Sequence, residues 1–195
     1  MIKHLRFDDY QKMPWKNGQG FTFEIARQSI ENSDDFAWRV SMADVEENGK
    51  FSFFENKKRI ISVLTGNGIK LSFSEKETRQ ILARDIYSFS GEQAVNCQLL
   101  DGSIRDLNLI YSSEHIQAIM KWIEGSDQQT ISSHASHVFV INMTAGYCIQ
   151  IEEDSYDLNT FDSLHIHQEN TQKNINLLSN SKYYLCLIEL WIDHP

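Results

Sequence analysis

The stretch that decides the fold is SVLTGNGIKL, residues 62–71. It places an apolar run before a threonine and two glycines, and then a run in which apolar and polar residues alternate. Glycine tolerates the positive φ that a tight turn demands, so the pattern predicts two antiparallel strands joined by a hairpin. The same order of strand, threonine, glycine-containing turn and strand returns in INMTAGYCIQI, residues 141–151.

Two further pairs of segments keep the same order downstream. Residues 85–89 resemble residues 160–164, and residues 95–99 resemble residues 185–188. The separation within each pair is roughly 75 to 90 residues, the size of one small jelly roll. We therefore expect an internal repeat of two β-barrels, with chance similarity between hairpins as the alternative.

Short segments of alternating apolar and polar residues recur along the whole chain, with turn residues between them. This spacing predicts an all-β sandwich or barrel. Residues 114–123 fit either a helix or a strand, and we favour a strand. The other expected strands cover residues 21–26, 36–43, 59–65, 69–73, 94–100, 104–111, 138–143, 147–151, 161–167 and 183–191.

Nothing in the sequence marks a flexible linker. The chain has two prolines, Pro14 and Pro195, and no tract rich in serine, glycine or charge divides it. We expect two halves, residues 1–112 and 113–195, which pack tightly in one compact unit.

Charge and hydropathy exclude several classes of partner. The chain carries 27 Asp and Glu residues against 18 Lys and Arg residues, for a formal net charge of −9. A nucleic-acid partner is not expected, because binding to its backbone needs a basic stripe. No apolar run approaches the roughly 18 residues of a membrane helix. The first nine residues carry charges where a signal peptide is apolar, which favours the cytoplasm.

The three cysteines, Cys97, Cys148 and Cys186, are widely spaced and odd in number, and two of them lie inside apolar alternating runs. This pattern is typical of reduced core thiols rather than of disulfides, zinc ligands or a nucleophile.

Several blocks within residues 13–110 resemble the HutD/Ves family. In chain order they are MPWKNGQGFTFEIA (13–26), FAWRVSMADV (36–45), GKFSFF (49–54), Arg59, LTGNG (64–68), FSGE (89–92) and DLNL (106–109). The chain departs from the family at Gln19, where a glycine is usual, and at Lys50, where a proline is usual. The resemblance implies an all-β bicupin fold of two jelly-roll, cupin-like barrels. It also associates some members with a brake on histidine utilisation and others with a stress response.

Cupin barrels commonly bind a metal through histidines and a glutamate at the barrel mouth. In the first half, the stretch before Gly66 offers Phe51, Ser52 and Arg59 but no histidine. A guanidinium cannot ligate a metal and repels a cation. We therefore expect no metal or other cofactor in this barrel, and a small carboxylate facing the arginine instead.

The candidate ligand-binding residues have polar or aromatic side chains and belong to the blocks that resemble the family. In each strand, residues two apart point to the same face. Thr22 therefore shares a face with Glu24, and Arg39 shares one with Ser41. Asp106 and Asn108 likewise share a face of their strand, where they could brace the pocket. A structural role is the alternative for each, including a cross-strand ion pair between Glu24 and Arg39. The full set is Trp15, Asn17, Thr22, Glu24, Arg39, Ser41, Ser52, Arg59 and Asn108. No catalytic residue is assigned.

A second group of polar residues lies late in the chain. His165 and His167, with Glu169, form the best metal candidate of the sequence, because all three fall on one face of a strand. We favour a polar, exposed strand end instead, and expect His134 and His137 in an edge loop.

These patterns favour a regulatory protein that binds a small carboxylate metabolite in its N-terminal barrel. The family association indicates histidine, urocanate or formiminoglutamate as the ligand. A cupin-type isomerase or hydrolase, with Glu24 or a histidine as proton carrier, is one alternative, and a protein-interaction module is another. The sequence has no Gly-x-Ser-x-Gly motif and no nucleotide fingerprint, so an enzyme is the less favoured hypothesis. The oligomeric state is left open, a homodimer included.

Overall fold

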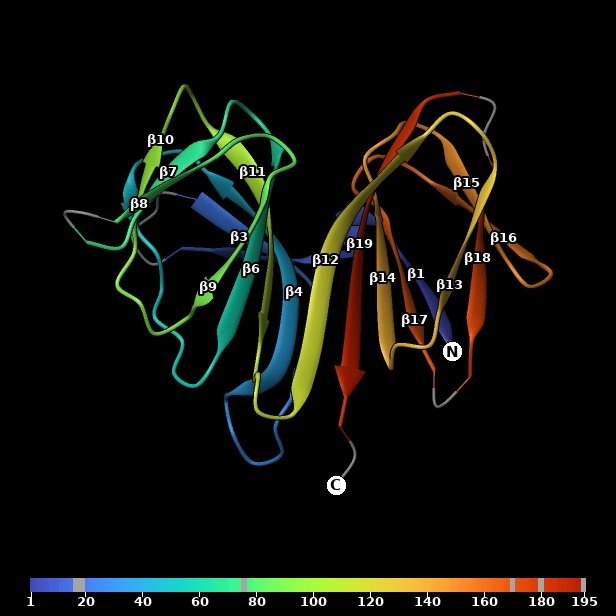
Figure 1. Cartoon of the computed structure of the whole chain (residues 1–195), viewed down its shortest axis with the longest axis horizontal. Helices are drawn as coiled ribbons and strands as arrows, with labels where there is room; N and C mark the ends of the chain where they lie inside the picture. The colour runs from blue at the N-terminus through green and yellow to red at the C-terminus, as the bar shows by residue number, and fades with distance from the viewer. Residues whose placement is uncertain (16–19, 75–76, 169–170, 179–180, 194–195) are drawn as a thin grey trace. The chain divides into compact units, whose positions relative to one another are not determined.

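The computed structural model describes residues 1–15, 20–74, 77–168, 171–178 and 181–193. Strands and the turns between them make up nearly all of these residues, which confirms the all-β prediction (Figure 1). The helical content of the described ranges is one 3-10 turn, Phe7–Asp9, and none of their helices is long and apolar enough to cross a membrane. The chain divides into two units, here named the N-terminal unit (Gln11–Glu114) and the C-terminal unit (Met1–Tyr10 with His115–Pro195).

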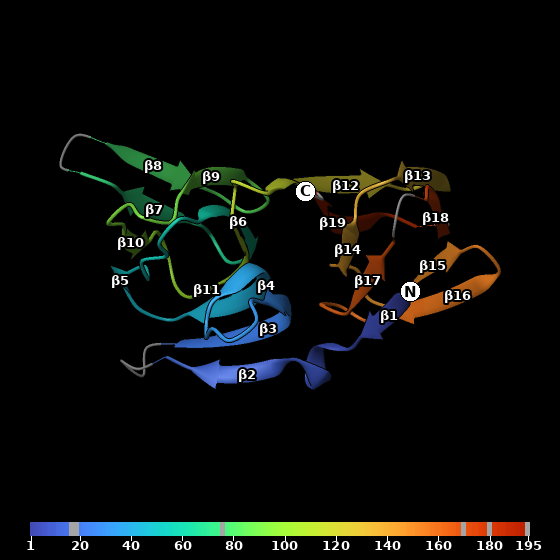
Figure 2. The same ribbon diagram turned by 90° about the horizontal axis from the view of Figure 1, so that it is seen from below.

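The N-terminal unit consists of two antiparallel sheets, with strand orders β2-β3-β4-β11-β6-β9 and β5-β10-β7-β8 (Figure 2). Its strands are β2 (Gln11–Pro14), β3 (Gly20–Ser29), β4 (Phe36–Val45), β5 (Gly49–Lys50), β6 (Lys58–Thr65), β7 (Ile69–Ser72), β8 (Thr78–Ile81), β9 (Ile86–Ser90), β10 (Asn96–Leu99) and β11 (Ile104–Tyr111).

The C-terminal unit also consists of two antiparallel sheets, with strand orders β1-β17-β14-β19-β12 and β13-β18-β15-β16. Its strands are β1 (Ile2–Leu5), β12 (Ile116–Gly125), β13 (Gln129–Ser133), β14 (His137–Asn142), β15 (Tyr147–Ile151), β16 (Asp154–Leu158), β17 (Ser163–His167), β18 (Lys173–Leu178) and β19 (Tyr183–Ile192).

The two units repeat one topology. The order β4-β11-β6-β9 in the first corresponds to β12-β19-β14-β17 in the second, and β5-β10-β7-β8 corresponds to β13-β18-β15-β16. Each strand from β4 to β11 therefore has a counterpart eight strands later, and both units are eight-stranded jelly rolls with added edge strands. The structure confirms the predicted match of the hairpin β6–β7 with β14–β15, and that of β9 with β17.

One predicted match is wrong. Residues 95–99 contain β10, whose counterpart is β18, whereas residues 185–188 belong to β19, the counterpart of β11. The two segments share only the alternation of apolar and polar residues. That alternation is common to all half-buried strands, so it does not identify which strand of the repeat a segment forms.

The hairpin glycines have the backbone conformation that the sequence predicted. Gly66 and Gly68 have φ of +93° and +111°, and Gly146 in the second hairpin has φ of +63°. A Cβ atom at Gly66 would lie 2.6 Å from the backbone oxygen of Ser103. This turn therefore requires glycine both for its backbone angle and for the close approach of the neighbouring chain.

All of the predicted strands are present, and the ambiguous residues 114–123 form part of β12. Eight further strands lie outside the expected ranges, namely β1, β2, β5, β8, β9, β13, β16 and β18. They are two to six residues long, and most lie at sheet edges. Short edge strands bury few side chains, so their apolar pattern is weak.

From the sequence we expect the first ten residues in the first half of the chain. In the structure they belong to the C-terminal unit instead. Strand β1 pairs with β17, and the hydroxyl of Tyr10 donates to the backbone oxygen of Phe161 at 2.8 Å. These contacts join residues about 150 positions apart, and no local pattern announces them. The division after Glu114 lies two residues from the expected boundary at 112.

Each unit has its own apolar core between its two sheets. In the N-terminal unit Ile61, Val63, Ile69 and Leu71 are fully buried. In the C-terminal unit the core is wholly apolar apart from the hydroxyls of Tyr147 and Tyr183. The three cysteines are free. Cys97 and Cys186 are buried, in agreement with the predicted core thiols, whereas Cys148 is only half-buried.

Candidate functional site

The N-terminal jelly roll contains a cavity of about 610 Å³ between its two sheets. Both sheets and the connections before β3 and after β5 contribute to its wall. The side chains that line it are Pro14, Trp15, Thr22, Arg39, Ser41, Ala43, Lys50, Phe51, Ser52, Phe54, Arg59, Asp106, Asn108 and Ile110.

The polar wall of the cavity is made by three neighbouring strands, β4, β11 and β6. In the antiparallel register, Asn108 on β11 lies opposite Ser41 on β4 and opposite Ile61 on β6. Directly opposed residues point to the same face of a sheet, so the alternate residues of all three strands face the cavity. The other face of β4 carries Val40 and Met42, both fully buried.

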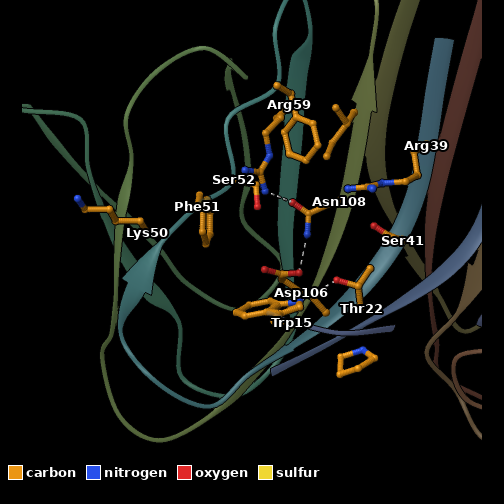
Figure 3. A pocket seen from close by; sticks show the side chains of 14 residues that line it. Trp15, Thr22, Arg39, Ser41, Lys50, Phe51, Ser52, Arg59, Asp106 and Asn108 are labelled. Atoms are coloured by element: carbon orange, nitrogen blue, oxygen red, sulfur yellow. Dashed lines mark hydrogen bonds between the residues drawn. The ribbon is translucent and has the colours of Figure 1, made fainter. Parts of the chain in front are cut away.

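A chain of hydrogen bonds runs along this wall. Arg59 Nη2 donates to Asn108 Oδ1 at 2.7 Å, and Asn108 Nδ2 donates to Asp106 Oδ1 at 2.6 Å (Figure 3). Asn108 thus joins a buried cation to a buried carboxyl group. On a neighbouring part of the wall, Trp15 Nε1 donates to Thr22 Oγ1 at 2.9 Å.

Burial shifts the titration of both charged ends of this chain. It lowers the pKa of Arg59 to about 10, with Asp106 acting in the opposite direction and Arg39 adding to the decrease. Burial likewise raises the pKa of Asp106 to about 7, against the charge of Arg59 and the hydrogen bond from Asn108. At neutral pH Arg59 therefore stays charged, while Asp106 is close to the midpoint of its titration.

Aromatic rings hold both guanidinium groups of the cavity. The Arg59 guanidinium lies 4.6 Å from the ring centre of Phe51 and 5.1 Å from that of Phe89. The Arg39 guanidinium lies 4.9 Å from the ring centre of Phe36 and 5.2 Å from that of Phe54. These distances are within the range of cation–π attraction, which orients each guanidinium without using up its hydrogen-bond donors.

Each of the two arginines keeps one buried donor without a partner. The Nε atoms of Arg39 and Arg59 are both buried, and neither makes a hydrogen bond to another described residue. Buried polar groups are nearly always hydrogen-bonded, so two such donors in one cavity point to an anionic ligand with acceptor oxygens.

Seven of the nine sequence-predicted binding residues line this cavity. Asn17 lies outside the described residues. Glu24 on β3 lies opposite Ser41 on β4 but does not belong to the lining. Its carboxylate is 3.6 Å from Arg27 Nε, and its charge also counteracts the decrease in pKa that burial causes in Arg39. The seven that the cavity brings together are Trp15, Thr22, Arg39, Ser41, Ser52, Arg59 and Asn108.

Seven lining residues are not among the predicted binding residues, and three of them contact or balance the buried guanidinium groups. Asp106 was expected only as a brace, and it forms the acidic end of the hydrogen-bond chain. Phe51 and Phe54 contact the guanidinium groups from the segment that follows β5. That segment is not a strand, so no alternation indicates which of its aromatic side chains face inward.

The histidines of the C-terminal unit differ from the prediction. His137 begins β14 and is buried, not in an edge loop, and His165 is buried with its ring stacked on Phe139 rather than exposed. His137 Nδ1 lies 3.0 Å from His165 Nε2. Glu169 lies outside the described residues, and within those that are described no group of three or more His, Cys, Asp or Glu side chains could hold a metal ion.

Residues 7–185 match the family model described as HutD. The chain belongs to the HutD family. An uncharacterised 21.2 kDa protein from the region 3′ of hutC in Pseudomonas putida is 40% identical to it over 190 residues, 97% of each chain. The protein Ves of Escherichia fergusonii is 32% identical over 142 residues, 71% of this chain and 73% of that protein.

Solved structures agree with this HutD-family assignment. A conserved protein of unknown function from Pseudomonas aeruginosa PAO1 is 36% identical, with a TM-score of 0.90 over 98% of this chain and 99% of that one. HutD from Pseudomonas fluorescens SBW25, in a formate condition, is 34% identical, with a TM-score of 0.86 over the full length of both chains. A cupin 2 conserved barrel domain protein from Leptotrichia buccalis, 11% identical, has a TM-score of 0.60 over 96% of this chain and 95% of that one, and shows the fold alone. The predicted bicupin fold is thereby confirmed.

Proposed function

We propose that this HutD-family protein binds a small carboxylate metabolite in the cavity of its N-terminal unit and thereby regulates a metabolic pathway in the cytoplasm. The observation that carries the proposal is the pair of buried Nε donors of Arg39 and Arg59, neither of which bonds to another residue in the described part of the chain. A buried guanidinium is costly unless it is paired, and a carboxylate offers two oxygens that match its fork.

The two arginines have different roles in this proposal. The charge of Arg59 is already partly offset by Asp106 through Asn108. Arg39 makes no hydrogen bond or ion pair to a described carboxylate, although the charge of Glu24, which lies outside the cavity lining, counteracts the decrease in pKa that burial causes in Arg39. In this proposal Arg39 binds the carboxylate of the ligand, and Arg59 holds the polar wall in place through its hydrogen bond to Asn108.

The first ligands to examine are histidine, urocanate and formiminoglutamate, which were the candidates from the sequence. Two relatives support this choice through their names, since one comes from the hutC region and one is HutD itself. Each of the three compounds carries at least one carboxylate that Arg39 can bind. Regulation of histidine utilisation is the pathway role that accompanies this choice.

A thermal-shift experiment on the full chain tests the proposal. A ligand that binds only the folded state raises the melting temperature, so at least one of the three compounds is expected to do so at millimolar concentration. The shift is expected to disappear in Arg39→Gln and to persist in Lys70→Gln, which removes the same charge from an exposed position on β7. 4-Methylimidazole, which lacks a carboxylate, serves as the negative control. No shift with any of the three compounds removes them as ligands.

Asp106 gives a specific reason to keep an enzyme as the second candidate. A buried carboxyl group with a pKa near neutrality in the wall of a cavity suits a general acid or base. Glu24, the proton carrier considered from the sequence, does not line the cavity. Conversion of a bound ligand, followed by NMR and lost in Asp106→Asn, would favour an isomerase or hydrolase. Tight binding without any product would favour the regulatory protein.

A further inference from the structure

The cavity has two ends of opposite electrical character. Ile110 on β11 lies opposite both Arg59 and Arg39, so the two arginines belong to one row across the sheet. Asp106 lies four residues back along the same strand, opposite Ala43. Asn108, opposite Ser41, lies on β11 between the row of the two arginines and the row that contains Asp106. Figure 3 shows this order, with Asn108 between Arg59 and Asp106.

The length of the hydrogen-bond chain gives the distance between these ends. The Asn108 amide bridges Arg59 and Asp106 through bonds of 2.7 and 2.6 Å. The guanidinium and the carboxyl group are therefore on the order of 7 Å apart. This distance matches the separation of the two polar groups in a short amino acid with a terminal amine or a small basic ring.

A carboxyl group is a poor lining for a cavity that accepts only anions. When Asp106 is ionised it repels a bound carboxylate and offsets part of the attraction from the arginines. The polar groups beside it in Figure 3, Trp15 and Thr22, are joined to each other, with the indole donating to the hydroxyl oxygen. A ligand group that donates a hydrogen bond at this end turns the repulsion into an attraction.

We propose that the cavity takes a bipolar ligand, with a carboxylate held by the arginine end and an N–H donor, such as an ammonium, imidazole or amidine group, held by Asp106. The inference rests on the proposed function and adds the second half of the ligand to it. Simple carboxylates of the same length are then the weaker ligands, and Asp106 is a specificity-determining residue.

The charged groups around Asp106 decide how its protonation affects binding. Arg59 on β6 stabilises the ionised form, and Asp44 on β4 opposes it. The charge of Asp44 is largely taken up by Arg105 on β11, which binds it through Nε at 2.6 Å and Nη2 at 2.8 Å.

Three other titratable groups lie near Asp106 or in the wall of the cavity. Cys97 on β10 stays a neutral thiol, because burial raises its pKa to about 12. Arg39 on β4 and Lys50 on β5 also line the cavity. Asp106 is therefore the group of the cavity wall whose charge changes near neutral pH.

The two kinds of ligand consequently respond to pH in opposite directions. A simple carboxylate binds best when Asp106 is protonated, so its affinity falls as the pH rises past about 7. A carboxylate that carries an ammonium group binds best when Asp106 is ionised, so its affinity increases over the same range. For a carboxylate at the arginine end, on the order of 7 Å from Asp106, the change in affinity is on the order of tenfold in a partly screened site. For an ammonium group in contact with Asp106 it is at least as large.

The test compares butyrate with 4-aminobutyrate on the full chain, by NMR titration at several pH values from about 6 to about 8. Neither ligand titrates in this range, because their carboxyl and amine groups ionise well outside it. We expect the dissociation constant of butyrate to increase with pH and that of 4-aminobutyrate to decrease. Asp106→Asn is expected to remove both slopes. Glu46→Gln, an equivalent change at an exposed position after β4, is expected to keep them.

The outcomes separate the inference from the proposed function. If both ligands bind with the same pH slope, or butyrate binds as tightly as 4-aminobutyrate above neutrality, the bipolar site is wrong and the carboxylate site stands. If neither ligand nor any of the three metabolites binds, both proposals are overturned. The pH dependence of the two dissociation constants in the unsubstituted protein tests the bipolar site by itself, so the test does not require Asp106→Asn to fold.

Discussion

Arg59 in the N-terminal jelly roll and Val138 in the C-terminal jelly roll occupy equivalent positions. Each lies six residues before the threonine of its hairpin, Thr65 or Thr144, on corresponding strands β6 and β14. Across the sheet, Asn108 lies opposite Ile61 on β6, and Leu187 lies opposite its counterpart Val140 on β14. By the same register Asp106 corresponds to Leu185. The polar wall of one unit is thus an apolar core in the other, where Val138, Leu185 and Leu187 are fully buried.

This equivalence indicates that the polar wall is not needed for the fold. Replacing a buried ionic network by apolar residues is often neutral or stabilising by about 1 to 4 kcal/mol. We therefore expect the triple variant Arg59→Val, Asp106→Leu, Asn108→Leu to unfold at a higher urea concentration than the unsubstituted protein, while losing carboxylate binding in the thermal-shift assay. Polar groups that a binding site buries commonly lower the stability of the folded protein.

The single variant Arg59→Val serves as the control for the triple variant. It leaves Asp106 buried without its counter-charge, so we expect it to be destabilised by about 3 to 5 kcal/mol at pH values where Asp106 is ionised. A triple variant that is less stable than this single variant would show that the wall has a structural role.

Arg39 is expected to contribute more to ligand affinity than to stability. It is partly buried, makes no ion pair with another described residue, and destabilises the charged form of Arg59. Arg39→Gln should therefore weaken carboxylate binding on the order of tenfold or more, with little change in the urea midpoint. Arg39→Lys should restore part of the affinity, because lysine keeps the charge and loses the fork. Equal binding by Arg39→Gln and the unsubstituted protein would assign the ligand to another group.

The sequence predicted those parts of the molecule that follow a local period. The hairpin at Gly66 needs positive φ, which only particular residues tolerate, and Arg59 shares the inward face of β6 with Ile61 and Val63. Together these two signals locate the first jelly roll and put a guanidinium inside it.

Features that depend on contacts between distant residues could not be predicted in this way. The pairing of Ile2 with Ile166 has no local pattern, so β1 was placed in the wrong half. The inward position of Phe54 depends on a segment outside the strands, and its backbone N–H bonds to Gly91, far along the chain. The strand period predicts that Asp106 and Asn108 point to the same face of β11. It does not predict that burial raises the pKa of Asp106.

Asp106 is expected to make the folded protein less stable as the pH rises toward neutrality. Its pKa in the folded protein, about 7, is above its ordinary value of 3.8. Between these values the folded protein holds a proton that the unfolded chain has released. The contribution of Asp106 to stability is therefore fully present below about pH 3.8 and is lost as the pH rises through about 7.

Urea unfolding of Asp106→Asn and the unsubstituted protein, at several pH values from about 4.5 to about 8, measures this contribution. The difference in unfolding free energy should move in favour of the variant as the pH rises, because the amide carries no charge to desolvate. Glu46→Gln, with its exposed side chain, should run parallel to the unsubstituted protein. A constant difference between Asp106→Asn and the unsubstituted protein would mean that Asp106 is ionised throughout the range.

The paired histidines of the C-terminal unit predict a pH dependence of the opposite sign. Burial lowers the pKa of His137 to about 4 and that of His165 to about 3, with repulsion from the neighbouring imidazoles adding to both decreases. Lys3 and the N-terminal amine also face His165 and disfavour its charged form. Both side chains are thus held neutral in the folded protein, whereas in the unfolded chain they take up a proton near pH 6.5.

Their contribution to stability is therefore complete above about pH 6.5 and is lost as the pH falls toward 4. We expect the unfolding free energy to decrease over this range, as followed by tryptophan fluorescence during urea unfolding. The double variant His137→Gln, His165→Gln should show a smaller decrease, because neither amide takes up a proton on unfolding. His134→Gln, which removes an exposed imidazole, should behave as the unsubstituted protein does. If the double variant loses as much stability on acidification as the unsubstituted protein, the acid sensitivity arises from other groups, and the 3.0 Å contact between His137 and His165 does not keep them neutral.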